Sequence, residues 1–327
     1  MKTMQDNCQV RIGKSFCVDF QRTLRILDDG NTYPLPPGLG MFPVLRVDDY
    51  AERVPPFWRK TGGVFIPVYQ REALWLDFTG TDWPPVAVKV GVGRVNALSG
   101  APLSEGLKGK PQDYLVCPDQ PWLDGIKAGE GFIRQFVAMP LGMGYSVEGQ
   151  ITGQENVGGV QFIVYEPKPG RFQARRPIDR ECCYMCCDSA GMGLGAGGRM
   201  RQKVYPDEYG IGTWDLSESG RLFVHIVNSM MFREITGREP PPTPVTTRTY
   251  AEHGLPWFDL YDEKMGDLPG SKKLAGVKSL KEMDKAKGFG PPPGDSPLAI
   301  PASQVKILGD SSPVYSWKPL VSMSKPG

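Results

Sequence analysis

Four cysteines close together are the residues of this sequence best suited to metal or redox chemistry. The run CCYMCC contains Cys182, Cys183, Cys186 and Cys187, with a C-x-x-C step between the second and the third. Thiolates at this spacing bind zinc or exchange disulfides. A structural zinc site usually takes four ligands from two such pairs, and this sequence has one. We therefore favour buried, small apolar side chains, predict no bound cofactor, and keep zinc or a redox response as the alternative.

The glycine run at residues 193–198 has the letters of a dinucleotide-binding motif, G-x-G-x-x-G. That motif needs a strand before it and a helix after it, so that the phosphates meet the helix N-terminus. Here the six residues are followed by a short alternating stretch and then by Pro206, which leaves no room for a helix. We predict a flexible glycine loop that binds no nucleotide.

One histidine and three glutamates are further candidates. His225 lies in the run LFVHIV, on the same strand face as Phe223, and this apolar setting favours a hydrogen-bonded core histidine over a catalyst. Glu148, Glu155 and Glu166 flank glycine-rich strand ends, where carboxylates for general acid–base chemistry can converge. Surface charge is the simpler interpretation, so the catalytic residues stay unknown.

Aromatic residues near the C-terminal end of the sequence suggest docking. Trp257, Phe258 and Tyr261 stand in a run that also contains acidic residues, and Tyr315 and Trp317 stand near the end of the sequence. Aromatic anchors of this kind are typical of docking peptides. The alternatives are a final strand that packs on the core for the first group and an unordered segment for the second.

Glycine and proline dominate the composition and favour strands over helices. The 40 Gly and 32 Pro among 327 residues interrupt helices and mark turns. Between them lie short runs with β-type patterns, of which 86–93 places Val on every second residue. The other predicted strands are 16–26, 64–69, 73–78, 113–117, 132–139, 159–166, 200–205 and 221–227. We predict a mainly β fold, an antiparallel sandwich or complex barrel with one or two short helices.

The composition changes near residue 263. Residues 264–327 hold ten Lys against five acidic residues, with frequent Gly and Pro. The sequence therefore predicts one β-rich domain at 1–262 and a flexible basic tail at 263–327, whose removal would leave the fold intact.

The net charge, and the pattern of apolar residues along the sequence, limit the classes of function that we expect. The net charge is +2, which lacks the basic excess of a nucleic-acid binder. No apolar leader or membrane-length apolar run is present, and the seven cysteines are odd in number, so we expect a soluble protein in the cytoplasm. The favoured function is a non-catalytic binding or assembly module, with a protein partner or self-association and no specific nucleic acid. The alternatives are a β-fold enzyme that uses carboxylates on an oligosaccharide or small metabolite, and a thiol- or metal-responsive protein.

Overall fold

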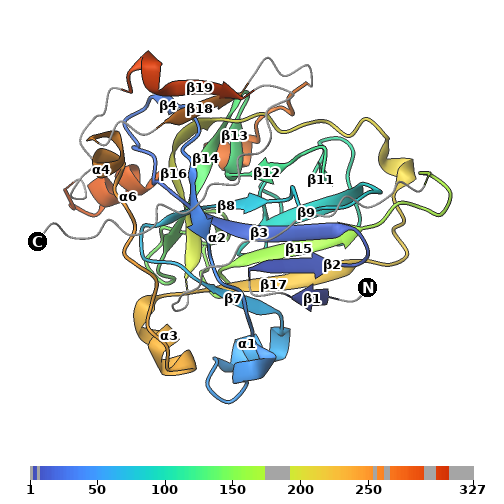
Figure 1. Cartoon of the computed structure of the whole chain (residues 1–327), viewed down its shortest axis with the longest axis horizontal. Helices are drawn as coiled ribbons and strands as arrows, with labels where there is room; N and C mark the ends of the chain where they lie inside the picture. The colour runs from blue at the N-terminus through green and yellow to red at the C-terminus, as the bar shows by residue number, and fades with distance from the viewer. Residues whose placement is uncertain are drawn as a thin grey trace, which may run out of the picture.

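Two β-sheets packed face to face form the body of the protein in the computed structural model (Figure 1). The structure describes residues 3–5, 8–173, 192–252, 256–260, 266–290 and 300–308. Over these residues the strand order of each sheet is an open path that does not close on itself. The predicted mainly β fold is therefore confirmed, and of the two predicted architectures the chain adopts the sandwich.

The first sheet has ten strands in the order β1-β2-β3-β8-β14-β16-β4, with β5 beside β3, β12 beside β8 and β13 beside β14. Its pairs are antiparallel except β16 with β4. The strands are β1 Thr3–Gln5, β2 Gln9–Ile12, β3 Phe16–Thr23, β4 Thr32–Tyr33, β5 Gly38–Met41, β8 Ala73–Asp77, β12 Trp122–Leu123, β13 Gly125–Gly129, β14 Phe132–Met139 and β16 Gly193–Arg201.

The second sheet has seven strands in the order β10-β9-β15-β17-β7-β6, with β11 beside β9. Its strands are β6 Leu45–Arg46, β7 Val64–Pro67, β9 Val86–Val92, β10 Val95–Asn96, β11 Leu115–Cys117, β15 Val160–Tyr165 and β17 Gly220–Val227. A separate parallel pair joins β18 Trp257–Leu260 to β19 Val305–Leu308, at the top of Figure 1.

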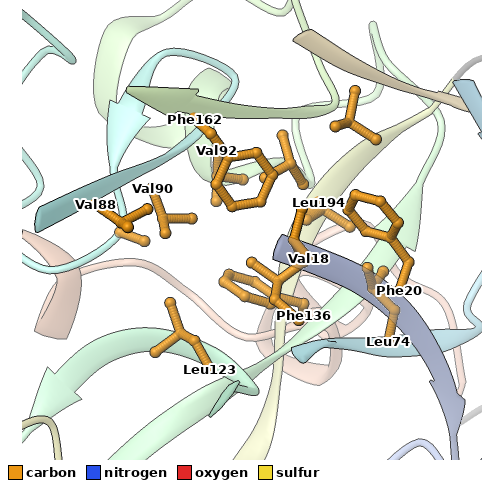
Figure 2. Close-up of a cluster of buried hydrophobic side chains, with 14 of the residues drawn as sticks. Val18, Phe20, Leu74, Val88, Val90, Val92, Leu123, Phe136, Phe162 and Leu194 are labelled. Carbon is orange, nitrogen blue, oxygen red and sulfur yellow. The ribbon is translucent and has the colours of Figure 1, made fainter. Parts of the chain in front are cut away.

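The hydrophobic core fills the space between the sheets because alternate residues of each strand point inward. Phe162 of β15 is its central contact. Its ring centroid lies 5.8 Å from that of Phe16, 6.4 Å from that of Phe20 and 6.5 Å from that of Phe78. Figure 2 labels ten members of this cluster: Val18, Phe20, Leu74, Leu123, Phe136 and Leu194 from the first sheet, and Val88, Val90, Val92 and Phe162 from the second.

The glycine run forms a strand, so the predicted flexible loop is wrong. The residues pair along β14 within β16, and they are buried. A Cβ on Gly198 would lie 2.3 Å from the carbonyl oxygen of Leu27, and one on Gly197 would lie 2.7 Å from a methyl of Val137. These glycines therefore allow neighbouring chain segments to approach β16 closely. The strand predicted at 200–205 begins earlier, at Gly193, and ends at Arg201.

Helices are short but more numerous than predicted, with six α-helices and three 3₁₀-helices in the described ranges. None of them is long and apolar enough to cross a membrane. The α-helices are α1 Pro56–Thr61, α2 Val147–Thr152, α3 Ser229–Thr236, α4 Thr247–Glu252, α5 Lys272–Ala275 and α6 Leu280–Ala286. The 3₁₀-helices are η1 Asp48–Tyr50, η2 Ile211–Thr213 and η3 Ala302–Gln304.

Residues 266–290, which the sequence assigned to the flexible tail, differ from that expectation. They form α5 and α6 and bury Leu274, Val277 and Leu280 against the sheets. The Asp284 carboxylate accepts two hydrogen bonds from the Arg71 guanidinium, at 2.9 and 2.7 Å. Although residues 266–290 are polar on average, regularly spaced apolar side chains and the Asp284 carboxylate attach them to the sheets.

Asp267 attaches the beginning of this stretch to the first sheet. The Nζ atom of Lys127 lies 2.6 Å from each Asp267 carboxylate oxygen, and the lysine side chain is fully buried. The same carboxylate accepts hydrogen bonds from the backbone N–H groups of Gly131 and Val204. A buried ammonium group needs such a partner, because water cannot solvate it.

We predict that Asp267→Asn lowers the free energy of unfolding by about 3–5 kcal/mol, because it removes the carboxylate charge that lies against the buried Lys127 ammonium. The control is Lys281→Ala, an exposed change in α6, for which we expect less than about 0.5 kcal/mol. Urea unfolding followed by far-ultraviolet circular dichroism measures both. Equal midpoints for Asp267→Asn and the unmodified protein would show that the contact between Lys127 and Asp267 contributes nothing to stability.

Candidate functional site

A groove of about 1050 Å³ lies over the outer face of the second sheet, the face turned away from the core. The end of α1, Arg46 of β6 and the start of β7 form one side. The segment Leu103, Ser104 and Glu105, between β10 and β11, contributes to the other. Residues from β15 and β17 form the floor. Its volume is slightly above the usual range for ligand sites in proteins, about 300–1,000 Å³.

Strand alternation on β17 places polar and aromatic side chains in this groove. Leu222 and Val224 belong to the central core, so the residues on either side of each point to the opposite face of the sheet. Arg221 and Phe223 consequently line the groove, and His225 follows them along the same face. The predicted position of His225 beside Phe223 is confirmed.

Four side chains form a stacked column that ends at the groove. The His225 ring stacks on Trp58, with centroids 4.4 Å apart, and on Phe223, with centroids 4.7 Å apart. The Arg94 guanidinium lies over the Phe223 ring at 5.9 Å from its centroid. Stacking on both faces of the imidazole fixes the plane of Phe223, and Phe223 in turn supports the charged group of Arg94.

His225 is buried and hydrogen-bonded, as the sequence predicted. Its Nε2 atom lies 3.1 Å from the Gly62 carbonyl oxygen and 3.2 Å from the Thr61 hydroxyl. Burial lowers the pKa of His225 to about 4, and the hydrogen bond to Gly62 only partly offsets this effect. The imidazole thus contributes no charge beside the groove near neutral pH.

Arg94 occupies a backbone conformation that is unusual for a residue with a side chain. Gly93 and Arg94 form the two-residue turn between paired Val92 and Val95, with φ values of +55° and +62°. A non-glycine residue in this region costs about 1–2 kcal/mol. The hydrogen bond from the Arg94 N–H to the Gln161 Oε1, at 2.6 Å, helps to hold the turn. Backbone strain that surrounding contacts enforce is concentrated at functional sites.

A buried lysine positions the groove wall that contains Ser104. Lys89 of β9 points to the outer face of the sheet and is almost fully buried. Its Nζ atom lies 2.9 Å from the Asp113 carboxylate and donates to the carbonyl oxygens of Ser104 and Gly106, each at 2.8 Å. The ammonium therefore joins two points of the segment between β10 and β11 to the sheet.

The groove contains three arginines and two acidic residues. Arg46 pairs with Asp48 at 3.3 Å, and Arg221 pairs with Glu105. All four of these side chains are more than half exposed, so each pair contributes about 1 kcal/mol or less. Within the described ranges Arg94 forms no ion pair, and it is exposed. The groove therefore carries a net positive charge that a ligand anion can neutralise.

Two further acids with raised pKa values lie outside the groove, on the outer face of the first sheet. Asp19 of β3 stands directly opposite Asp77 of β8. Burial, and secondarily the charge of Asp77, raises the pKa of Asp19. Burial also raises the pKa of Asp124 to about 7, and Gln202 donates a hydrogen bond to its carboxylate. Trp122 stands opposite Asp77 on the other side of β8, with its ring 6.4 Å from that of Trp75.

The three glutamates singled out in the sequence do not converge on one site. Glu148 accepts hydrogen bonds from the backbone N–H groups of residues 156, 157 and 158, and Glu155 accepts from those of residues 144 and 146. Glu166 accepts a hydrogen bond from the Lys14 N–H. Each of the three carboxylates thus binds the backbone of a different chain segment.

The other predicted site residues are either buried or outside the described residues. Trp257 is fully buried and Phe258 is 8% exposed, in a cluster with Leu35 and Ile133, so the predicted docking role is wrong for these two. The packed-strand alternative is correct for them. Cys182, Cys183, Cys186 and Cys187, together with Tyr261, Tyr315 and Trp317, lie outside the described residues. Among the residues that are described, no group of three or more metal-ligating side chains can hold an ion.

Comparison of the chain with protein-family models, with curated proteins and with solved structures gave no match. The function is therefore argued from the groove and from the charges around it. Sequence analysis missed the three groove arginines. The pattern Val92-Gly93-Arg94-Val95, a two-residue turn between strand residues, is the one local signal that marked Arg94.

We predict that His225 makes the protein less stable in acid. Its pKa is about 4 in the folded state and about 6.5 when unfolded, so below pH 6.5 the unfolded chain takes up a proton that the fold does not. Stability attributable to this residue falls between pH 6.5 and 4, by roughly 3 kcal/mol in total. His225→Phe keeps the stack and should remove this part of the pH dependence, whereas His253→Gln should retain it. Urea unfolding at a series of pH values provides the test, and parallel curves for His225→Phe and the unmodified protein would contradict it.

Proposed function

We propose that the protein is a non-catalytic binding module and that the groove on the second sheet binds an anionic ligand. The observation that carries this proposal is the Arg94 side chain. It stands on a stacked aromatic column, at a strained turn, beside a groove of about 1050 Å³, and it has no acidic partner in the described part of the chain.

The two exposed ion pairs support the same function. Asp48 and Glu105 pair with Arg46 and Arg221, and exposed pairs exchange partners at little cost. A guanidinium group binds carboxylates and phosphates through two parallel hydrogen bonds. The groove has three guanidinium groups, on β6, on β17 and on the turn between β9 and β10. Each of them can therefore bind a negative group of an anionic ligand.

The test is the binding of labelled anionic probes at low salt, measured by fluorescence anisotropy with a polyglutamate peptide, a heparin oligosaccharide and a single-stranded oligonucleotide. We expect at least one probe to bind, and Arg94→Glu to weaken it by about tenfold or more, which corresponds to about 1.4 kcal/mol. The matched control is Arg238→Glu, the same charge reversal at an exposed arginine outside the groove. Equal effects of the two variants, or no binding of any probe, would refute the proposal.

A carboxylate enzyme is a second candidate function, and the raised pKa of Asp19 is the observation in its favour. An acid that stays protonated can donate a proton to a leaving group, and a neighbouring carboxylate such as Asp77 can complete the pair that glycoside hydrolysis needs. The nearby Trp75 and Trp122 rings are of the type that contacts sugars. The alternative of a thiol or zinc response rests on cysteines outside the described residues.

Hydrolysis of a panel of nitrophenyl glycosides tests this second candidate. We expect Asp19→Asn and Asp77→Asn each to reduce turnover by at least a hundredfold, because each removes one member of the pair. Asp49→Asn, at an exposed position, should leave turnover unchanged. Turnover that does not exceed the uncatalysed rate, or that survives both substitutions, would exclude the carboxylate pair as a catalytic site.

A further inference from the structure

The charge density of the groove restricts the class of anion. It holds three arginines and two acids, a balance of one positive charge, and the whole chain carries +2. Binding a nucleic acid or another dense polyanion relies on many basic groups that together neutralise successive phosphates. A ligand with a few separated negative charges matches this groove better.

Carboxylates are the anions that the groove arginines already contact. The chain's own acids, Asp48 and Glu105, pair with Arg46 and Arg221. Because these pairs are exposed, an acidic side chain from a ligand can replace either acid with the same geometry and at little cost. Arg94 adds a third position for a carboxylate, one that the described chain leaves open.

Apolar groups lie deeper in the groove than the charged ones. Ile163 is 7% exposed, and Phe223 and Leu103 are partly buried, whereas the three arginines are exposed. A ligand that fills the groove must therefore present apolar groups to the floor and negative groups to the rim. In an extended peptide successive side chains point to opposite sides, so alternation of acidic and apolar residues provides both.

We propose that the groove binds an extended peptide segment of a partner protein in which acidic residues alternate with apolar ones. This inference rests on the proposed function and adds the class of ligand to it. Burial of the apolar side chains supplies affinity, and the arginines determine which segments are accepted.

The experiment compares two labelled peptides of equal charge, each about twelve residues and roughly 40 Å when extended. One alternates Glu with Leu, and the other alternates Glu with Ser. We expect the Glu-Leu peptide to bind the full-length protein at least tenfold more tightly. Leu103→Ser should remove most of this preference, and Arg94→Glu should weaken both peptides. Melting temperatures of the variants show whether each is folded.

The outcomes separate this inference from the proposed function. If the two peptides bind equally, or if an oligonucleotide or tripolyphosphate binds more tightly than either and still depends on Arg94, the groove binds anions but the peptide class is wrong. If no anionic probe depends on Arg94, both proposals fail. A Glu-Leu preference that Leu103→Ser leaves unchanged would place the peptide outside the groove and also overturn the inference.

Discussion

Phe162 points from β15 into the space between the two sheets, where its ring meets those of Phe16, Phe20 and Phe78. Because the side-chain period of a strand is two residues, this one inward position sends Gln161 and Ile163 to the opposite face. There both residues line the groove. The contact that joins the sheets thereby also determines which side chains of β15 a ligand can reach.

Buried charges position the elements around this sandwich. Lys89 holds the groove segment that contains Ser104 against the second sheet, and Lys127 holds residues 266–290 to the first sheet through Asp267. A buried ammonium tolerates few arrangements, since it needs both a counter-charge and hydrogen-bond acceptors. Each lysine therefore fixes a segment outside the two sheets whose own sequence contains many turn residues.

The candidate site combines a rigid support with exposed charges. Trp58, His225 and Phe223 stack beneath Arg94, whereas Arg46 and Arg221 form exposed ion pairs. Rigid aromatic contacts reduce the entropy that a ligand must remove on binding, and weakly paired arginines remain available for exchange. The proposed binding of an anionic ligand would use both parts of this arrangement. Burial keeps His225 neutral beside the charged groove, because it lowers the pKa of the imidazole.

Local sequence pattern determined much of the fold and little of the site. Alternating Val residues in 86–93 and the run around His225 identified β9 and β17, because strand periodicity is a property of neighbouring residues. The glycine run became a strand and residues 266–290 became packed helices, because the contacts that decide both outcomes come from distant residues such as Leu27 and Lys127. The groove arginines lie 48 and 127 positions apart in sequence, at Arg46, Arg94 and Arg221. The pairing of β9, β15, β17, β7 and β6 in one sheet brings these arginines to the same groove. That pairing depends on long-range contacts, so no local sequence pattern could have predicted it.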